Sequence, residues 1–170
     1  NCTVRFELKE NQFTVTKELS NIGISNKSNI VTKGKSFSAK LTPYKGYVLT
    51  EVTVKMNGRD VKAPFNNKSC NIKISKVNGD ITIFAKSKKS QTISVKKSFT
   101  KKKGCKPFYL KAKAKTKLTY SSSNKKVATV NSKGKVTVKR VGKTTITIKA
   151  ISSSTYVSDT KRIAVTVKKK

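Results

Sequence analysis

Hydrophobic and polar residues alternate along several short stretches of the first half of the chain. Apolar side chains recur at every second position, with serine, threonine or lysine between them, and the clearest stretches are 37–41, 52–56, 72–74 and 81–85. A period of two places one set of side chains in a core and the other in solvent. The pattern therefore predicts half-buried β-strands at these places.

Turn-forming residues separate these stretches. Glycine and asparagine, which adopt the positive φ of tight turns at low cost, occur in segments 33–35, 43–46, 57–60, 66–67 and 78–80. No stretch has a convincing helical period. Short strands at this spacing predict an antiparallel β-sandwich.

A second series of alternating stretches begins near residue 90. It comprises residues 110–117, 135–139, 145–150 and 162–168, and lysines hold many of its solvent positions. The polar segment KSKKS at 86–90 has no periodicity and predicts a linker. We therefore expect two domains, residues 1–89 and 90–170, a division that also suits the length of 170 residues.

Charge is the feature that changes this picture most. The chain has 40 lysines and arginines against 7 acids, a formal net charge of +33, and Asp159 is the one acid after residue 89. A field of this sign attracts polyanions, and it also keeps a protein soluble and its copies apart. Charge alone therefore leaves a binding role and a solubility role open.

Three segments of the second half carry a family resemblance. They are SSSNKKVATV at 121–130, SKGKVTV at 132–138 and VGKTTITI at 141–148. In order and spacing they resemble the bacterial immunoglobulin-like group 2 domain over about residues 91–168. Residues 107–110 and Tyr156 are similar to variants found in surface proteins of gut Firmicutes.

The first half is similar to a repeat module of exported Firmicutes surface proteins, through residues 13–16, 19–22, 41–43, 46–47, 52–56 and 79–83. The two resemblances imply an all-β chain of two tandem antiparallel immunoglobulin-like β-sandwich domains. They also imply a bacterial protein that is extracellular or on the cell surface, with adhesive or spacer roles and further immunoglobulin-like repeats in the same chain. The family shares no catalytic or binding residues.

Candidate catalytic groups are scarce. The chain has no histidine, which excludes bases and triads built on imidazole, and its seven acids form no recognisable pair on one predicted strand face. The run Ser121–Ser123 near Lys125 favours a turn over a nucleophile. Segments 133–135 and 142–144 lack the spacing of a phosphate-binding loop. We expect no enzyme and no cofactor.

The three cysteines, Cys2, Cys70 and Cys105, lack the spacing of a metal site. An exported protein can form one disulfide from them, and Cys2 with Cys70 is the pair that we expect, although three free thiols fit the same count. No stretch approaches the roughly 18 apolar residues of a membrane-spanning helix. We therefore expect no metal site and no transmembrane segment.

Clustered basic residues of the second domain are the candidate binding site. They are Lys101, Lys102, Lys103 and Lys106, a ladder of Lys111, Lys113, Lys115 and Lys117, and Lys135, Lys139, Arg140 and Lys143. We favour the ladder, because alternate strand residues are about 6.6 Å apart, a spacing comparable to charges on a sulfated glycan or a phosphate backbone. A solvated strand face explains each cluster equally well.

The expected partner is an anionic polysaccharide or nucleic acid held by non-specific electrostatics. Candidates are glycosaminoglycans, mucin glycans, extracellular DNA and teichoic acid. A structural spacer whose charge serves solubility or wall association is the alternative, and a non-specific nucleic-acid-binding protein is the third. The chain has no recognition helix and few arginines, which disfavours reading of base sequence. A dense patch would favour binding, and an even coat would favour the spacer.

Overall fold

The structure, a computed structural model, describes residues 11–170, and this part of the chain is all-β. It divides into two compact units between Lys88 and Lys89. The strands of the first unit are β1 (Gln12–Ser20), β2 (Ile22–Ile24), β3 (Ile30–Thr32), β4 (Phe37–Pro43), β5 (Tyr47–Met56), β6 (Arg59–Asp60), β7 (Cys70–Ile74) and β8 (Ile81–Lys89). Those of the second are β9 (Ser98–Lys102), β10 (Phe108–Tyr109), β11 (Leu118–Ser122), β12 (Ala128–Val130), β13 (Lys135–Val138), β14 (Gly142–Ala150) and β15 (Asp159–Lys168).

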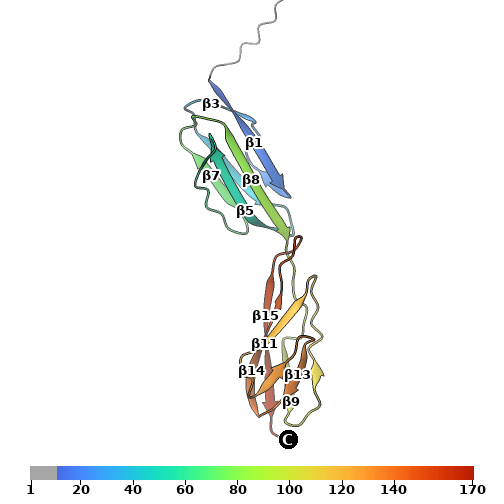
Figure 1. Ribbon diagram of the computed structural model, residues 1–170. Coiled ribbons are helices and arrows are strands. Elements are labelled where there is room, and N and C mark those ends of the chain that lie inside the picture. The colour runs from blue at the N-terminus through green and yellow to red at the C-terminus, as the bar shows by residue number, and fades with distance from the viewer. Residues whose placement is uncertain (1–10) are drawn as a thin grey trace, which may run out of the picture. The chain divides into compact units, whose positions relative to one another are not determined.

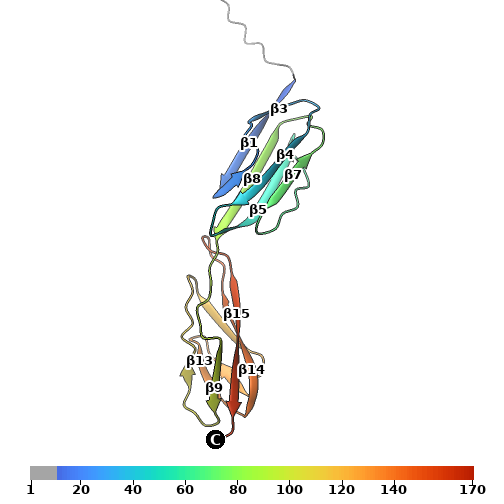
Figure 2. The ribbon, with the colours of Figure 1, turned by 180° about the vertical axis from the view of Figure 1, so that it is seen from behind.

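Each unit contains two sheets (Figures 1 and 2). In the first unit the strand orders are β3-β1-β8-β5-β6 and β2-β4-β7; in the second they are β11-β14-β15-β9 and β10-β13-β12. The assigned registers are antiparallel, apart from one parallel pair in each unit, β1 with β8 and β9 with β15. In both parallel pairs, an early strand of the unit lies beside its last strand.

Alternating apolar residues fill one core in each unit. In the first, Leu41, Ile81 and Ile83 are fully buried, and in the second Ile146 and Ile148 are fully buried. All five lie in stretches where the sequence pattern predicts strands. The two-residue turn Asn57-Gly58 between β5 and β6 has φ of 51° and 74°, as the hairpin signal predicts.

The predicted linker at 86–90 is wrong for most of its length. Strand β8 runs to Lys89, and its parallel ladder with β1 continues as far as the pair Ser20 and Lys86. The hydroxyl of Ser87 also donates to the carbonyl of Ser20 at 2.7 Å. The strand therefore continues into residues that show no hydrophobic period.

The two described cysteines differ in accessibility. Cys70 is a free thiol that is 1% exposed, and Cys105 is free and half-buried, whereas Cys2 lies outside the described residues. Burial raises the pKa of the Cys70 thiol, and its Sγ lies 3.6 Å from the carbonyl oxygen of Ala63. The expected pairing of Cys70 with Cys2 therefore stays a prediction.

Alkylation is expected to modify Cys105 at least tenfold faster than Cys70 in the folded protein. The thiolate is the reactive species, and Cys70 is both shielded and held in the thiol form. Timed alkylation with iodoacetamide, followed by peptide mass mapping, measures both rates. Denaturant is the control, because it should bring the two rates together; equal rates in the folded protein would contradict the burial of Cys70.

Candidate functional site

Two parallel strands bring basic residues to one end of the second domain. Strands β9 and β15 pair from Ser98 with Ala164 to Lys102 with Lys168, so both strands leave the sheet at the same end. The backbone N–H of Lys103 then donates to the carbonyl of Lys168 at 2.9 Å. Gly104 follows with φ of 83° and turns the chain away from the strand. The parallel register thus places residues that follow β9 beside residues that follow β15.

The connection from β13 to β14 forms the other side of this end. The N–H groups of Lys139 and Arg140 both donate to the carbonyl of Val127, at 2.8 and 3.2 Å. Gly142 has φ of 145°, and a Cβ there would lie 3.0 Å from a methyl group of Val127. Only glycine suits this backbone conformation, which holds residues 139–141 in place.

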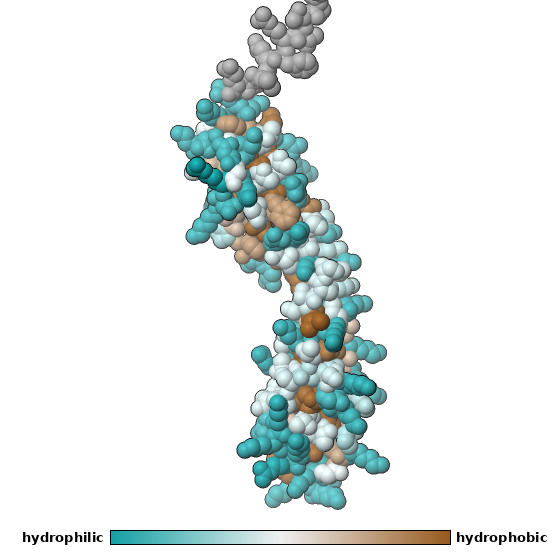
Figure 3. Space-filling view, viewed as in Figure 1, coloured by the Kyte–Doolittle hydropathy of each residue, from teal (hydrophilic) through white to brown (hydrophobic). Residues whose placement is uncertain are grey.

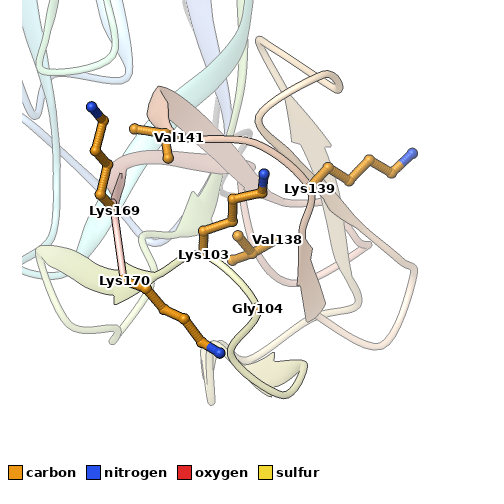
Figure 4. A pocket seen from close by; sticks show the side chains of 7 residues that line it. All are labelled: Lys103, Gly104, Val138, Lys139, Val141, Lys169 and Lys170. Atoms are coloured by element: carbon orange, nitrogen blue, oxygen red, sulfur yellow. The ribbon is translucent and has the colours of Figure 1, made fainter.

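An open groove of about 600 Å³ lies between these segments, and its lining residues are Lys103, Gly104, Val138, Lys139, Val141, Lys169 and Lys170. Figure 4 shows the four lysine side chains spread around the groove, with their ammonium groups pointing in different directions. Val141 is 44% exposed and gives the groove an apolar wall. The arrangement suits several spaced anionic groups better than one small anion.

Within residues 90–170, no side-chain carboxylate lies near this groove. Asp159 is the one acid of residues 90–170, and it begins β15, whereas the groove lies where β15 ends. A strand of ten residues spans on the order of 30 Å, several times the Debye length of about 8 Å at physiological salt. Asp159 instead accepts hydrogen bonds from the N–H groups of Ile93 and Thr160, at 2.9 and 2.8 Å.

The structure brings only part of the predicted basic set together. Lys103 and Lys139 line the groove, and Lys102 precedes it on β9. Lys101 turns inward, and its ammonium lies 4.9 Å from the ring centroid of Phe108, a cation–π contact. Lys135 begins β13, at the opposite end of that strand from Lys139.

The remaining predicted residues outside the ladder are exposed. Arg140 lies between β13 and β14, Lys143 is on the outer face of β14, and Lys106 lies in the loop between β9 and β10. Sequence reasoning missed Lys169 and Lys170, which the groove includes. Their position directly after the last predicted strand was the available signal, but the parallel pairing with β9 was not visible in the sequence.

The predicted lysine ladder is wrong as a strand. Its alternation is present, because Lys111, Lys113, Lys115 and Lys117 are all exposed while residues between them are at least half-buried. However, the segment 110–117 is not a strand: its one β-bridge is the isolated pair of Ser94 with Lys113, and Lys111 has φ of 51°. The regular strand spacing on which this site was favoured is therefore absent.

The hydroxyls at the end of β11 and just after it, in residues 121–124, have structural roles. Thr144 is 5% exposed, and its Oγ1 accepts the N–H of Asn124 at 3.0 Å and lies 3.0 Å from the hydroxyl of Ser122. The hydroxyl of Ser122 donates to the carbonyl of Ala128, and that of Ser123 accepts the N–H of Thr145. These contacts give the serine run a structural role. The predicted turn is wrong for Ser121 and Ser122, which pair with β14 as the end of β11.

Residues 11–170 show neither a metal-binding cluster nor a membrane-spanning helix. No group of three or more cysteine, aspartate or glutamate side chains is placed to hold a metal ion. No helix there is long and apolar enough to cross a membrane. Figure 3 shows hydrophilic residues over most of the visible face of each unit.

Comparisons with known proteins give one family match, which lies in the second domain. Residues 109–155 match the family model described as "Intimin, immunoglobulin-like domain". No curated protein matches the chain. A solved structure of Drosophila N-cadherin EC1-3 is 10% identical with a TM-score of 0.38, covering 95% of this chain and 68% of that one. Titin domains z1z2 in complex with telethonin are 9% identical with a TM-score of 0.33, covering 94% of each chain.

The family match agrees with the sheets described above. It covers the segment from β10 to the end of β14, which contributes to both sheets of the second unit. It supports a bacterial immunoglobulin-like domain in this half of the chain. The predicted fold class is confirmed: the chain forms two tandem immunoglobulin-like β-sandwich domains.

Proposed function

We propose that this chain is a non-catalytic adhesion module of a bacterial surface protein, and that it binds anionic polymers at the basic end of its second domain. The observation that carries the proposal is the groove with four lysines around it, with the domain's one acid a strand length away. The match to an intimin-type immunoglobulin-like domain supports a surface role.

Lysine chemistry supports a polymer as the ligand. An ammonium is a compact point charge, which attracts sulfate, phosphate or carboxylate without selecting a planar geometry. The ammonium groups around the groove point in different directions, so a chain with repeated charges engages more of them than one small anion does. Glycosaminoglycans, mucin glycans, teichoic acid and extracellular DNA all provide such repeats.

Removing four lysines from the groove is expected to weaken binding to heparin and to duplex DNA at least tenfold at 0.1 M salt. The groove variant carries K103S, K139S, K169S and K170S. Each lost contact on duplex DNA should reduce the slope of log K against log salt by about 0.9, because fewer counterions are released. Titrations monitored by fluorescence anisotropy, across a salt series, measure both quantities.

The ladder offers a matched control with the same loss of charge. A variant with K111S, K113S, K115S and K117S removes four exposed lysines from a segment without regular strand structure, and we expect its affinity to fall less than threefold. Equal losses in both variants would show a diffuse coat and favour a spacer. Loss of parental binding by about 0.15 M salt would contradict the proposed function itself.

A further inference from the structure

One sheet face of the second domain differs in composition from the rest of its surface. In the sheet β11-β14-β15-β9, most outward positions of the three middle rows carry short hydroxyl side chains, which are exposed or half-buried. The register places them side by side on the four strands: Ser121, Thr147, Thr145, Ser98, Thr166 and Thr100. Exposed Ala164 pairs with both Thr145 and Ser98 at the centre. We call this set the hydroxyl face.

Basic residues lie at both ends of the hydroxyl face and at two positions within its rows. Arg162 is the register partner of Thr147, and Lys143 is that of Thr166. Lys149 lies beyond them toward the start of β15, and Lys102 and Lys168 lie toward its end. Lys102 and Lys168 lead directly to the groove, because Lys103 and Lys169 follow them in the chain. The central row of Thr145, Ala164 and Ser98 therefore has no basic residue, and basic residues flank it on both sides.

Strand propensity alone accounts for single threonines, since threonine suits a pleated surface. It does not account for the lack of lysine in the central row, because outward strand positions elsewhere, such as Lys40 and Lys73, carry lysine in the same phase. A hydroxyl both donates and accepts hydrogen bonds, as the hydroxyls of a sugar do. None of the positions that form the hydroxyl face is aromatic, so it offers no platform on which a base can stack.

We propose that the hydroxyl face is a track for an anionic polysaccharide, whose sugar hydroxyls bond the serines and threonines while its charged groups meet the surrounding lysines and the groove. This inference rests on the proposed function and narrows its ligand from polyanions in general to charged glycans. From Arg162 to Lys168 the strand spans on the order of 20 Å, which accommodates several sugar rings.

The test removes hydroxyls without removing charge. The face variant carries T145V, T147V and T166V, and the control variant carries T129V and T137V, which pair with each other across β12 and β13 in the other sheet. Valine keeps the shape of threonine and favours strands. Binding to heparin and to duplex DNA is measured for both variants and the parent at the same salt concentration.

We expect the face variant to bind heparin at least fivefold more weakly, with duplex DNA binding unchanged within twofold and the control variant unchanged on both ligands. Unchanged heparin binding, or an equal loss on heparin and DNA, would overturn the inference while leaving the proposed function intact if the parent still binds. If the face variant does not fold, a second substitution, A164Q, tests the same inference by placing a larger side chain at the centre of the hydroxyl face. T137Q is its control, and we expect A164Q alone to weaken heparin binding. If the parent protein bound neither polymer, this result would instead contradict the proposed function.

Discussion

Replacing Ile148 with alanine is expected to cost the second domain about 2–5 kcal/mol of folding free energy, the range for large-to-small core substitutions. Ile148 is fully buried in the middle of β14, with Tyr120 and Lys161 as its cross-strand neighbours. Truncation leaves a cavity where two sheets pack, and close-packed cores relax only partly around such a space. Urea unfolding followed by circular dichroism measures the change.

The neighbouring residue provides the control for this prediction. Thr147 lies on the outer face of the same strand, and T147A should change stability by about 0.5 kcal/mol or less. The contrast tests the inward and outward assignment of β14, on which both the core and the hydroxyl face depend. Equal destabilisation by the two substitutions would show that this assignment is wrong.

Replacing Gln91 with leucine is expected to destabilise the second domain by about 1–3 kcal/mol for each hydrogen-bonding group left unpaired. Gln91 is 9% exposed, and its amide joins three segments of the domain. Its Nε2 donates to the carbonyl of Val157 at 2.7 Å, and its Oε1 accepts the N–H of Lys115 at 3.2 Å. Leucine fills the space but leaves both backbone groups without this partner.

Hydrogen exchange gives the sharper measurement for Gln91. Segment 110–117 pairs with a strand neighbour at only one bridge, so we expect the amides near Lys115 to lose protection in Q91L before those of β14 do. Q91E is the conservative comparison, because its carboxylate can still accept the N–H of Lys115 but cannot donate to Val157. Uniform loss of protection across the domain would contradict a local role for Gln91.

The fold could be predicted wherever one face of a strand is buried and the other is exposed to solvent. Strands such as β4, β7 and β14 repeat apolar residues at every second position, and the register cannot slip without exposing them. Residues 86–89 and 110–117 show the limits of this signal. The first segment is a strand because backbone pairing continues past the last apolar residue, and the second alternates in burial without forming a ladder.

The candidate site was less accessible from the sequence. Composition indicated the charge, and Lys103 and Lys139 were among the predicted residues, but the groove joins them to Lys169 and Lys170 through a contact between the two ends of the domain's sequence. No local pattern carries that information. Thr144 was missed for a similar reason, because its position in the alternation shows burial but not the turn that it holds.

The parallel pairing of β9 with β15 has a further consequence when the chain is pulled. Because the two strands run in the same direction, a tension applied to the start of β9 and the end of β15 slides one strand along the other. The ladder bonds from Ser98–Lys102 to Ala164–Lys168 then bear the force together, whereas in a peeling geometry they would break one at a time. β1 and β8 repeat the arrangement from Val15 with Ile81 to Ser20 with Lys86, so tension between the start of β1 and the end of β8 loads that ladder in the same geometry.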